Sequence, residues 1–260
     1  MLRTIWTASS FVVFAIGGLL FGLVYAPLLY LTIWNPARRQ RVARASVSKL
    51  FGFFFWYMGV TLHEFDIVGT LQREPEPHCL IVANHPMLVD AVWLMWLFPG
   101  VDCVVKASHW HNPVMMAAVR AAAYLRNDDD EALLNESVAR LKSGNSMVMF
   151  PQGTRVRIGQ QPELKRGAAV IALRAGVDLL PIRIEADPPT LRKGEPWLSI
   201  PPRRVRLRLT IMDRLDPQDF VAPADLTDGP DGPALSRTGE RRASHAVTER
   251  LRQLLLKRVD

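Results

Sequence analysis

The feature that most constrains this chain is a long stretch near its amino terminus without a charged side chain. Residues 4–37 contain no Asp, Glu, Lys or Arg, and the part from Ile5 to Trp34 is almost wholly apolar. A helix needs about 20 apolar residues to cross a bilayer, so this run predicts a membrane-anchoring helix. Trp6 near one end and Tyr30 near the other suit the two membrane interfaces.

The flanks of this run indicate its orientation. A secretory signal is a poor interpretation, because the run is too long and lacks a clear small-residue cleavage site. Several breakers leave a re-entrant turn open beside a spanning helix, namely Gly17, Gly18, Gly22 and Pro27. Basic residues follow the run at Arg38, Arg39, Arg41, Arg44 and Lys49, against Arg3 alone before it. This asymmetry predicts that the rest of the chain faces the cytoplasm.

The next segment, residues 40–65, predicts a second helix. Its first half is basic, and its second half, Leu50 to Val60, is rich in Phe, Trp and Met. This pattern favours an interfacial helix at the lipid headgroups, with a core helix of the soluble domain as the alternative. We therefore assign residues 1–63 to membrane-anchoring helices and expect the lipid bilayer as a partner.

From residue 64 onward, short apolar runs alternate with helical patterns, which predicts an α/β fold with a largely parallel sheet flanked by helices. The expected strands cover residues 64–69, 80–83, 101–105, 147–150, 179–184 and 205–211, within a domain of residues 64–220. Residues 221–239 are rich in Pro, Gly and Asp and predict a linker. Residues 240–260 predict a basic amphipathic helix, docked on the membrane or on the domain.

The net charge of +7 suits a nucleic acid, an anionic membrane or a phosphorylated partner. The chain has no zinc-finger spacing or RNA-binding signature, so we expect no nucleic acid. Cys79 and Cys103 are the two cysteines, each in or beside an expected strand. This placement favours reduced core thiols over a lone disulfide.

Chemistry enters at the end of the first buried strand of the domain. Leu80–Ala83 is followed by Asn84 and His85, and Asp90 lies in the first turns of the next expected helix. A His at such a junction can act as a general base, and an Asp five residues later can fold back to orient its ring. In isolation this spacing favours a buried, hydrogen-bonded His at a helix start.

A second polar segment changes that balance. Phe150-Pro-Gln-Gly-Thr-Arg155 follows the apolar strand Met147–Met149, so two polar strand ends meet at one edge of the sheet. The pair resembles the motifs of the glycerolphosphate and lysophosphatidic acid acyltransferase family, over about residues 51–215. Gln152 departs from this pattern, since the family has Glu at that position.

The resemblance implies a membrane-bound O-acyltransferase. It implies that a fatty acyl chain moves from a coenzyme A or acyl-carrier-protein thioester to a lysophospholipid hydroxyl, and that no cofactor is needed. Lysophosphatidic acid, giving phosphatidic acid, is the expected acceptor; another amphiphilic alcohol or glycolipid is the alternative, given Gln152. His85 is then the base, Asp90 orients it, and the acceptor attacks the thioester directly.

The substrate-binding residues are expected around these motifs. Backbone amides and a guanidinium in the loop Gly153-Thr154-Arg155 suit a phosphate, and Gln152 beside them is expected to be a further substrate contact. Resemblance adds basic residues at Lys106, Arg126 and Lys165, with solvated surface charges as the alternative. Asn84 either donates to the reacting carbonyl or caps the turn, and the second role is favoured.

Two other classes remain open. His109 and His111, with His85 and Asp90, could ligate zinc in a hydrolase, although the resemblance implies no metal. A non-enzymatic membrane adaptor would explain the anchor and the charge, but it would not explain the paired strand-end motifs.

Overall fold

A computed structural model describes residues 2–61, 63–68, 78–157, 159–196, 198–199, 201–229 and 232–256. Its centre is a seven-stranded sheet in the order β1-β7-β6-β2-β5-β3-β4. The β6–β7 pair is antiparallel and the other pairs of this sheet are parallel. These strands are β1 His63–Val68, β2 Leu80–Ala83, β3 Asp102–Lys106, β4 Leu125–Asn127, β5 Met147–Met149, β6 Leu179–Asp187 and β7 Val205–Ile211. The expected α/β class with a largely parallel sheet is confirmed.

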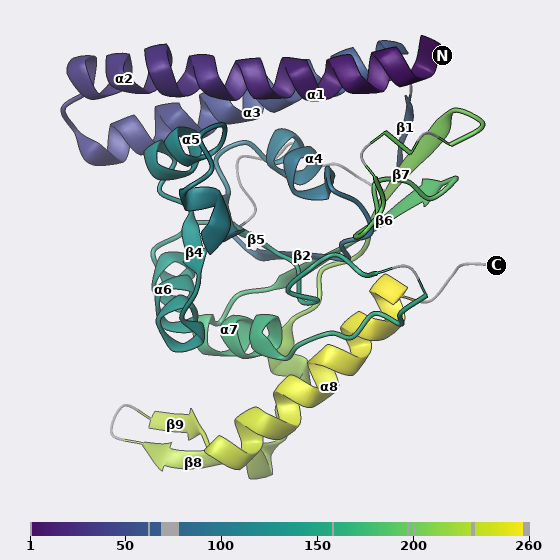
Figure 1. Cartoon of the computed structure of the whole chain (residues 1–260). Coiled ribbons are helices and arrows are strands. Elements are labelled where there is room, and N and C mark those ends of the chain that lie inside the picture. Colours follow the sequence, from purple (N-terminus) through teal and green to yellow (C-terminus); the bar gives the residue numbers. More distant parts are fainter. Residues whose placement is uncertain are drawn as a thin grey trace.

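Helices cover both faces of this sheet (Figure 1). One face packs against α3 Pro36–Thr61, α4 Asp90–Leu97 and α5 Met116–Ala121. The other packs against α6 Asp130–Lys142, α7 Gly167–Ala175 and α8 Arg237–Leu256. Strand β2 divides its side chains between the two layers and is buried throughout, as expected for a central parallel strand.

The sheet brings the two polar segments to one edge. β2 lies between β5 and β6, and β5 pairs with β3, all in parallel. Asn84 follows β2, Lys106 ends β3, and Phe150 follows β5. Because parallel strands end at the same side, the motifs leave the sheet next to one another.

An apolar layer lies across the domain (Figure 1). It consists of α1 Leu2–Leu20, a π-helical turn Phe21–Tyr25 and α2 Ala26–Thr32, running along α3. Within the described residues, Arg3–Thr32 is the one helix long and apolar enough to cross a membrane. A Cβ at Gly18 would lie 2.3 Å from the carbonyl oxygen of Val114, so this helix rests directly on the domain.

Helix α3 differs from the interfacial helix expected over Leu50 to Val60. Phe51, Phe54 and Phe55 are buried, and they pack against α1 and α4 through aromatic contacts. This matches the core-helix alternative, because a face covered by two other helices cannot lie among lipid headgroups. Phe53 and Trp56 remain exposed on the outer side.

The expected linker over residues 221–239 is also a wrong assignment for the part described. This region holds a 3-10 turn Pro223–Asp225, a hairpin of β8 Leu226–Gly229 and β9 Gly232–Leu235, and the start of α8. Another 3-10 turn, Pro217–Phe220, precedes it. Asp225 is buried and accepts a hydrogen bond from Arg242, which ties the turn to α8. The Pro, Gly and Asp residues therefore build tight turns rather than a free segment.

Helix α8 docks on the domain, which resolves the two alternatives given for it. Its buried face includes Ala243, Val247, Leu251 and Leu255 and packs against α7 and β6. An ion pair between Arg174 and Glu240 adds a surface contact at 2.7 Å. Residues 257–260, the end of the expected helix, lie outside the described residues.

A buried ionic network joins α3 and α6 to the sheet. Asp102, at the start of β3, accepts hydrogen bonds from Arg44 of α3 and, at 2.6 Å, from Arg140 of α6. Arg44 also donates to the carbonyl oxygens of Gly100 and Ala122. Arg44 is thus a structural residue inside the protein. It is not one of the exposed basic residues that the sequence analysis expected to follow the apolar run on the cytoplasmic side.

We expect Asp102→Asn to destabilise the protein by about 3–5 kcal/mol, because two largely buried guanidinium groups lose their shared counter-charge. In a protein of this size the Tm should fall by about 10 °C, measured by circular dichroism in detergent. Glu249→Gln breaks the exposed pair with Arg252 on α8 and serves as the control. A Tm for Asp102→Asn no lower than that of the control would contradict the structural role.

Candidate active site

The centre of the site is a histidine held by a buried carboxylate. The Nδ1 of His85 lies 2.9 Å from Oδ2 of Asp90, and the same oxygen accepts the backbone N–H of Met87 at 2.7 Å. Asp90 is 0% exposed and begins α4, where the positive end of the helix dipole favours a carboxylate. The carboxylate accepts, so Nδ1 carries the proton and Nε2 is left as the basic nitrogen of the neutral ring.

Burial gives this pair its chemistry. Loss of solvent raises the pKa of Asp90 above the ordinary value, while the hydrogen bonds from His85 and Met87 and the charge of Arg155 lower it. Its Oδ1 is buried and has no hydrogen-bond partner among the described residues. Such a poorly solvated carboxylate stabilises a positive charge on the imidazole beside it.

The second motif holds the first. The side-chain oxygen of Gln152 accepts the backbone N–H of His85 at 2.6 Å. The ring of Phe150 stacks on the imidazole with centroids 4.3 Å apart. A Glu at position 152 could accept the same hydrogen bond, so Gln152 preserves the geometry that the family's residue would give. Sequence reasoning placed Gln152 among the substrate contacts and missed this partner.

Asn84 has a structural contact on each side of its amide. It donates to the carbonyl oxygen of Ile184 at 2.8 Å and accepts from the backbone N–H of Ile184 at 2.7 Å. These bonds tie the end of β2 to β6. They favour a positioning role for Asn84, close to the capping role preferred from the sequence.

Cationic groups gather beside the dyad. Arg155 donates to the carbonyl oxygen of Leu191 at 3.1 Å and interacts electrostatically with Asp90. Burial lowers the pKa of His109 from its ordinary value, and the charges of Lys106 and Arg155 lower it further. Lys106 and Arg155 therefore act on His109 and favour its neutral form, and we call these three residues the cation cluster after the two charged ones. The sequence analysis considered His109 only as a zinc ligand. Its position just after β3, at the sheet edge where the two motifs lie, is the signal that could have assigned it to this site.

The other expected basic residues lie further out. Arg126 at the end of β4 forms an exposed ion pair with Asp128 at 2.7 Å. Lys165 lies beside Gly153, whose positive φ of 68° closes a turn on the carbonyl oxygen of Phe150. Thr154 accepts a hydrogen bond at 2.9 Å from Lys193, a residue the sequence reasoning missed. Lys165 therefore lies at the second motif, as expected, whereas Arg126 is paired with Asp128 on the surface.

The residues considered for zinc do not form a metal site in this structure. In the described part of the chain, no group of three or more His, Cys, Asp or Glu side chains could hold a metal ion. His109 belongs to the cation cluster, where neighbouring positive charges oppose a cation.

Known proteins resemble this chain over the region that contains the site. A family model described as "Acyltransferase" matches residues 64–185, which include both motifs. The chain is 26% identical over 191 residues to a 1-acyl-sn-glycerol-3-phosphate acyltransferase of Limnanthes douglasii, covering 71% of this chain and 66% of that protein. It is 28% identical over 140 residues to the Pseudomonas aeruginosa enzyme of that name, covering 52% and 54%.

A human relative, 1-acyl-sn-glycerol-3-phosphate acyltransferase alpha, is 27% identical over 169 residues, covering 62% of this chain and 59% of that protein. The matches thus span no more than 66% of the length of these relatives. The crystal structure of the 1-acyl-sn-glycerophosphate acyltransferase from Thermotoga maritima has the same fold, with a TM-score of 0.67, 18% identity and 98% and 100% of the two chains covered. Residues 64–185, which carry both motifs, thus match the acyltransferase family, and the relatives named here are 1-acyl-sn-glycerol-3-phosphate acyltransferases.

Proposed function

We propose that this protein transfers a fatty acyl chain from a thioester to the free hydroxyl of lysophosphatidic acid, giving phosphatidic acid. The observation that carries the proposal is the His85–Asp90 pair at 2.9 Å with the cation cluster beside it. A base and an adjoining phosphate site are what this acceptor requires. The names of the relatives support the same substrate class.

The reaction needs two proton transfers, from the acceptor hydroxyl to His85 and from His85 to the leaving thiolate. Nε2 of His85 takes the hydroxyl proton while the acceptor oxygen forms a bond to the thioester carbonyl carbon. Asp90 stabilises the imidazolium so formed. As the tetrahedral intermediate collapses, the carbon–sulfur bond breaks, and the imidazolium returns the proton to the leaving thiolate. The acceptor oxygen attacks directly, so the scheme uses no Ser or Cys nucleophile of the protein.

The acceptor fixes where its phosphate lies. In lysophosphatidic acid the reacting hydroxyl and the phosphate sit on adjacent carbons, so the phosphate must bind close to His85. Arg155 interacts electrostatically with Asp90, the partner of that base, and shares its region with Lys106. A phosphate at the cation cluster therefore leaves its hydroxyl within reach of Nε2. Gln152 holds the backbone of His85, so its departure from Glu gives no reason to choose another alcohol.

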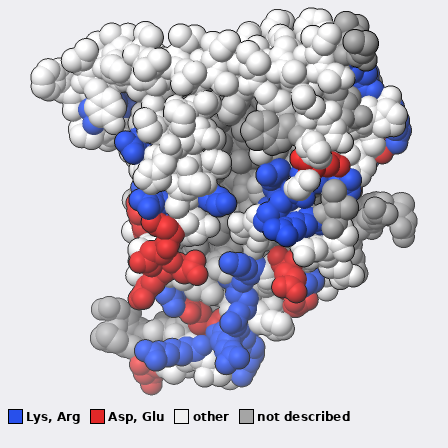
Figure 2. Space-filling model, in the orientation of Figure 1, with Lys and Arg blue, Asp and Glu red and all other residues white. Residues whose placement is uncertain are grey.

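The apolar layer supplies the membrane contact in this proposal. Leu23 and Leu31 are 76% and 73% exposed, and Trp34 is 86% exposed, which is costly in water. Figure 2 shows this layer almost free of charged residues, while Lys, Arg, Asp and Glu gather on the domain below it. The bilayer receives this face, and the basic residues that follow, including Arg38 and Arg41, keep the site on the cytoplasmic side.

The function is tested by an acceptor screen on the purified protein with labelled acyl-coenzyme A and acyl carrier protein, read by mass spectrometry. We expect labelled phosphatidic acid as the main product from either donor. A main product from an acceptor without a phosphate would contradict the proposal.

We expect His85→Ala to lower kcat by roughly 10²- to 10⁴-fold, the usual contribution of a positioned base. The variant should keep the Tm and membrane association of the wild type, since the ring is partly exposed at the strand end. Turnover should also survive a chelator, because no step involves a metal. Near-normal activity of His85→Ala would rule out this mechanism.

A second prediction concerns the acceptor phosphate. Arg155→Ala should raise the KM for lysophosphatidic acid about 30- to 150-fold, equivalent to about 2–3 kcal/mol for a charge-assisted contact. Arg155→Lys should recover part of this loss, since an ammonium cannot form the bidentate contact. Arg208→Ala, which breaks an exposed pair with Asp66, is the control. Equal losses for lysophosphatidic acid and for monoacylglycerol would refute the phosphate role.

The third prediction concerns the anchor. Replacing both Leu23 and Leu31 by Gln should weaken membrane binding by about 3–6 kcal/mol, the burial free energy of two leucines. More protein should then be released from membranes by alkaline carbonate, and activity on vesicle substrate should fall while activity in micelles remains. The control replaces Leu198 and Leu226, exposed leucines outside the apolar layer, by Gln. Equal release of the two double variants would show that the layer is not the anchor.

A further inference from the structure

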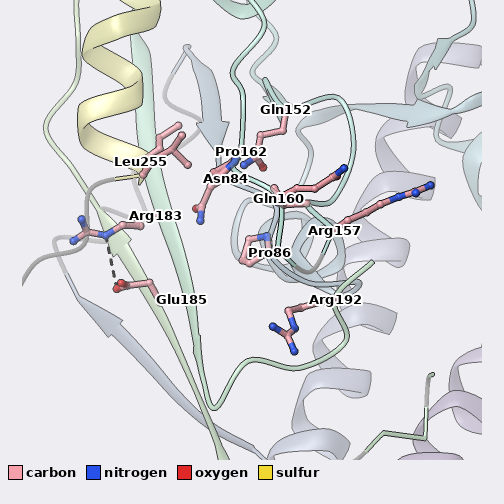
Figure 3. Close-up of a pocket in the computed structure, with 13 residues that line it drawn as sticks. Asn84, Pro86, Gln152, Arg157, Gln160, Pro162, Arg183, Glu185, Arg192 and Leu255 are labelled. Carbon is pink, nitrogen blue, oxygen red and sulfur yellow. Dashed lines mark ion pairs between the residues drawn. The ribbon is translucent and has the colours of Figure 1, made fainter. Parts of the chain in front are cut away.

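A cavity of about 370 Å³ lies next to the loop that carries His85 (Figure 3). Its walls come from the ends of the two motifs, residues 156–157 and 159–162 that follow the second motif, strand β6 and the last turn of α8. The mechanism above does not use this cavity.

The cavity borders the loop that carries the catalytic base. Asn84 and Pro86 flank His85 in the chain, and Gln152 bonds its backbone, so the inner end of the cavity is the loop that carries the base. The three residues of the cation cluster are not among its lining residues. The acceptor phosphate at that cluster therefore leaves this cavity open for the second substrate.

The chemistry of the lining suits a polar chain that ends in a phosphate. Three arginines line the cavity against one carboxylate, Glu185, which lies 3.7 Å from Arg183. Arg192 donates to Glu195 through Nε and Nη2, and its Nη1 has no hydrogen-bond partner among the described residues, so one edge of the guanidinium can receive a ligand. In Figure 3, Arg183 and Arg192 flank the cavity, whereas Arg157 extends from its rim away from Arg183.

We propose that this cavity binds the 4′-phosphopantetheine arm of the acyl donor, with its phosphate at Arg183 and Arg192. The inference rests on the proposed function. The amides of the arm meet polar groups such as Gln152 and Gln160, and its methyl groups meet Leu255 and Leu256. The volume is near the lower end of the roughly 300–1,000 Å³ of ligand pockets, enough for the arm but not for a nucleotide or a protein carrier.

The arm is common to coenzyme A and acyl carrier protein, so the cavity recognises what the two donors share. The thiol end then lies at the catalytic loop, and the carrier stays outside the cavity. Helix α8 acquires a role here, because its last turn forms one wall. Its docking on α7 and β6 holds that wall in place.

The test is a series of shortened donors with lysophosphatidic acid at saturation. The same acyl group is carried by coenzyme A, by 4′-phosphopantetheine and by pantetheine, which lacks the phosphate. The first two donors should have similar KM values, and the KM for acyl-pantetheine should be roughly 10- to 100-fold higher. Acyl carrier protein is a fourth donor, and comparison with coenzyme A identifies the preferred source.

Arg192→Gln should raise the KM for both phosphate-bearing small donors by the same factor and leave the KM for acyl-pantetheine and for lysophosphatidic acid unchanged. Arg250→Gln is the control, since it removes the same charge from the exposed side of α8. Equal effects of Arg192→Gln on all donors, or equal KM values across the series, would overturn the inference. No transfer from any donor would instead refute the proposed function, and the inference with it.

Discussion

The site depends on one buried carboxylate that accepts two hydrogen bonds. Asp90 receives the ring N–H of His85 and the backbone N–H of Met87 on a single oxygen, so it fixes the loop and the tautomer together. Its position at the start of α4 adds the helix dipole to these contacts. Without the carboxylate, neither the loop nor the imidazole ring would be held. The five-residue spacing between His85 and Asp90 therefore matters, because it lets one carboxylate reach both groups.

The two motifs work as one unit because the sheet brings them together. β2 and β5 are parallel neighbours, and Gln152 and Phe150 reach across to His85 through a hydrogen bond and a ring stack. On the other side of β2, Asn84 is bonded to β6. The loop that carries His85 is thus held from both neighbouring strands.

The sequence was sufficient for the sheet class, for the positions of β2 and β5 and for the His85–Asp90 pair, because strand burial and motif spacing are local properties. It could not identify the partner of Gln152 or of Arg44, since those contacts join residues 67 and 58 positions apart. Arg44 resembles a flanking membrane charge until the fold places Asp102 beside it. The hairpin was missed, and the docking of α8 was left as one of two alternatives, for the same reason: composition describes turns, but the packing surface comes from distant strands.

The central claim is that Asp90 holds His85 with the proton on Nδ1 and with Nε2 free for the acceptor hydroxyl. Nitrogen NMR of histidine-labelled protein in detergent, with His85→Gln used to assign the signal, tests it directly. At a pH where the ring is neutral, the account predicts a protonated Nδ1 and an unprotonated Nε2, and Asp90→Asn should abolish that preference. A neutral ring with its proton on Nε2 in the wild type would contradict the account.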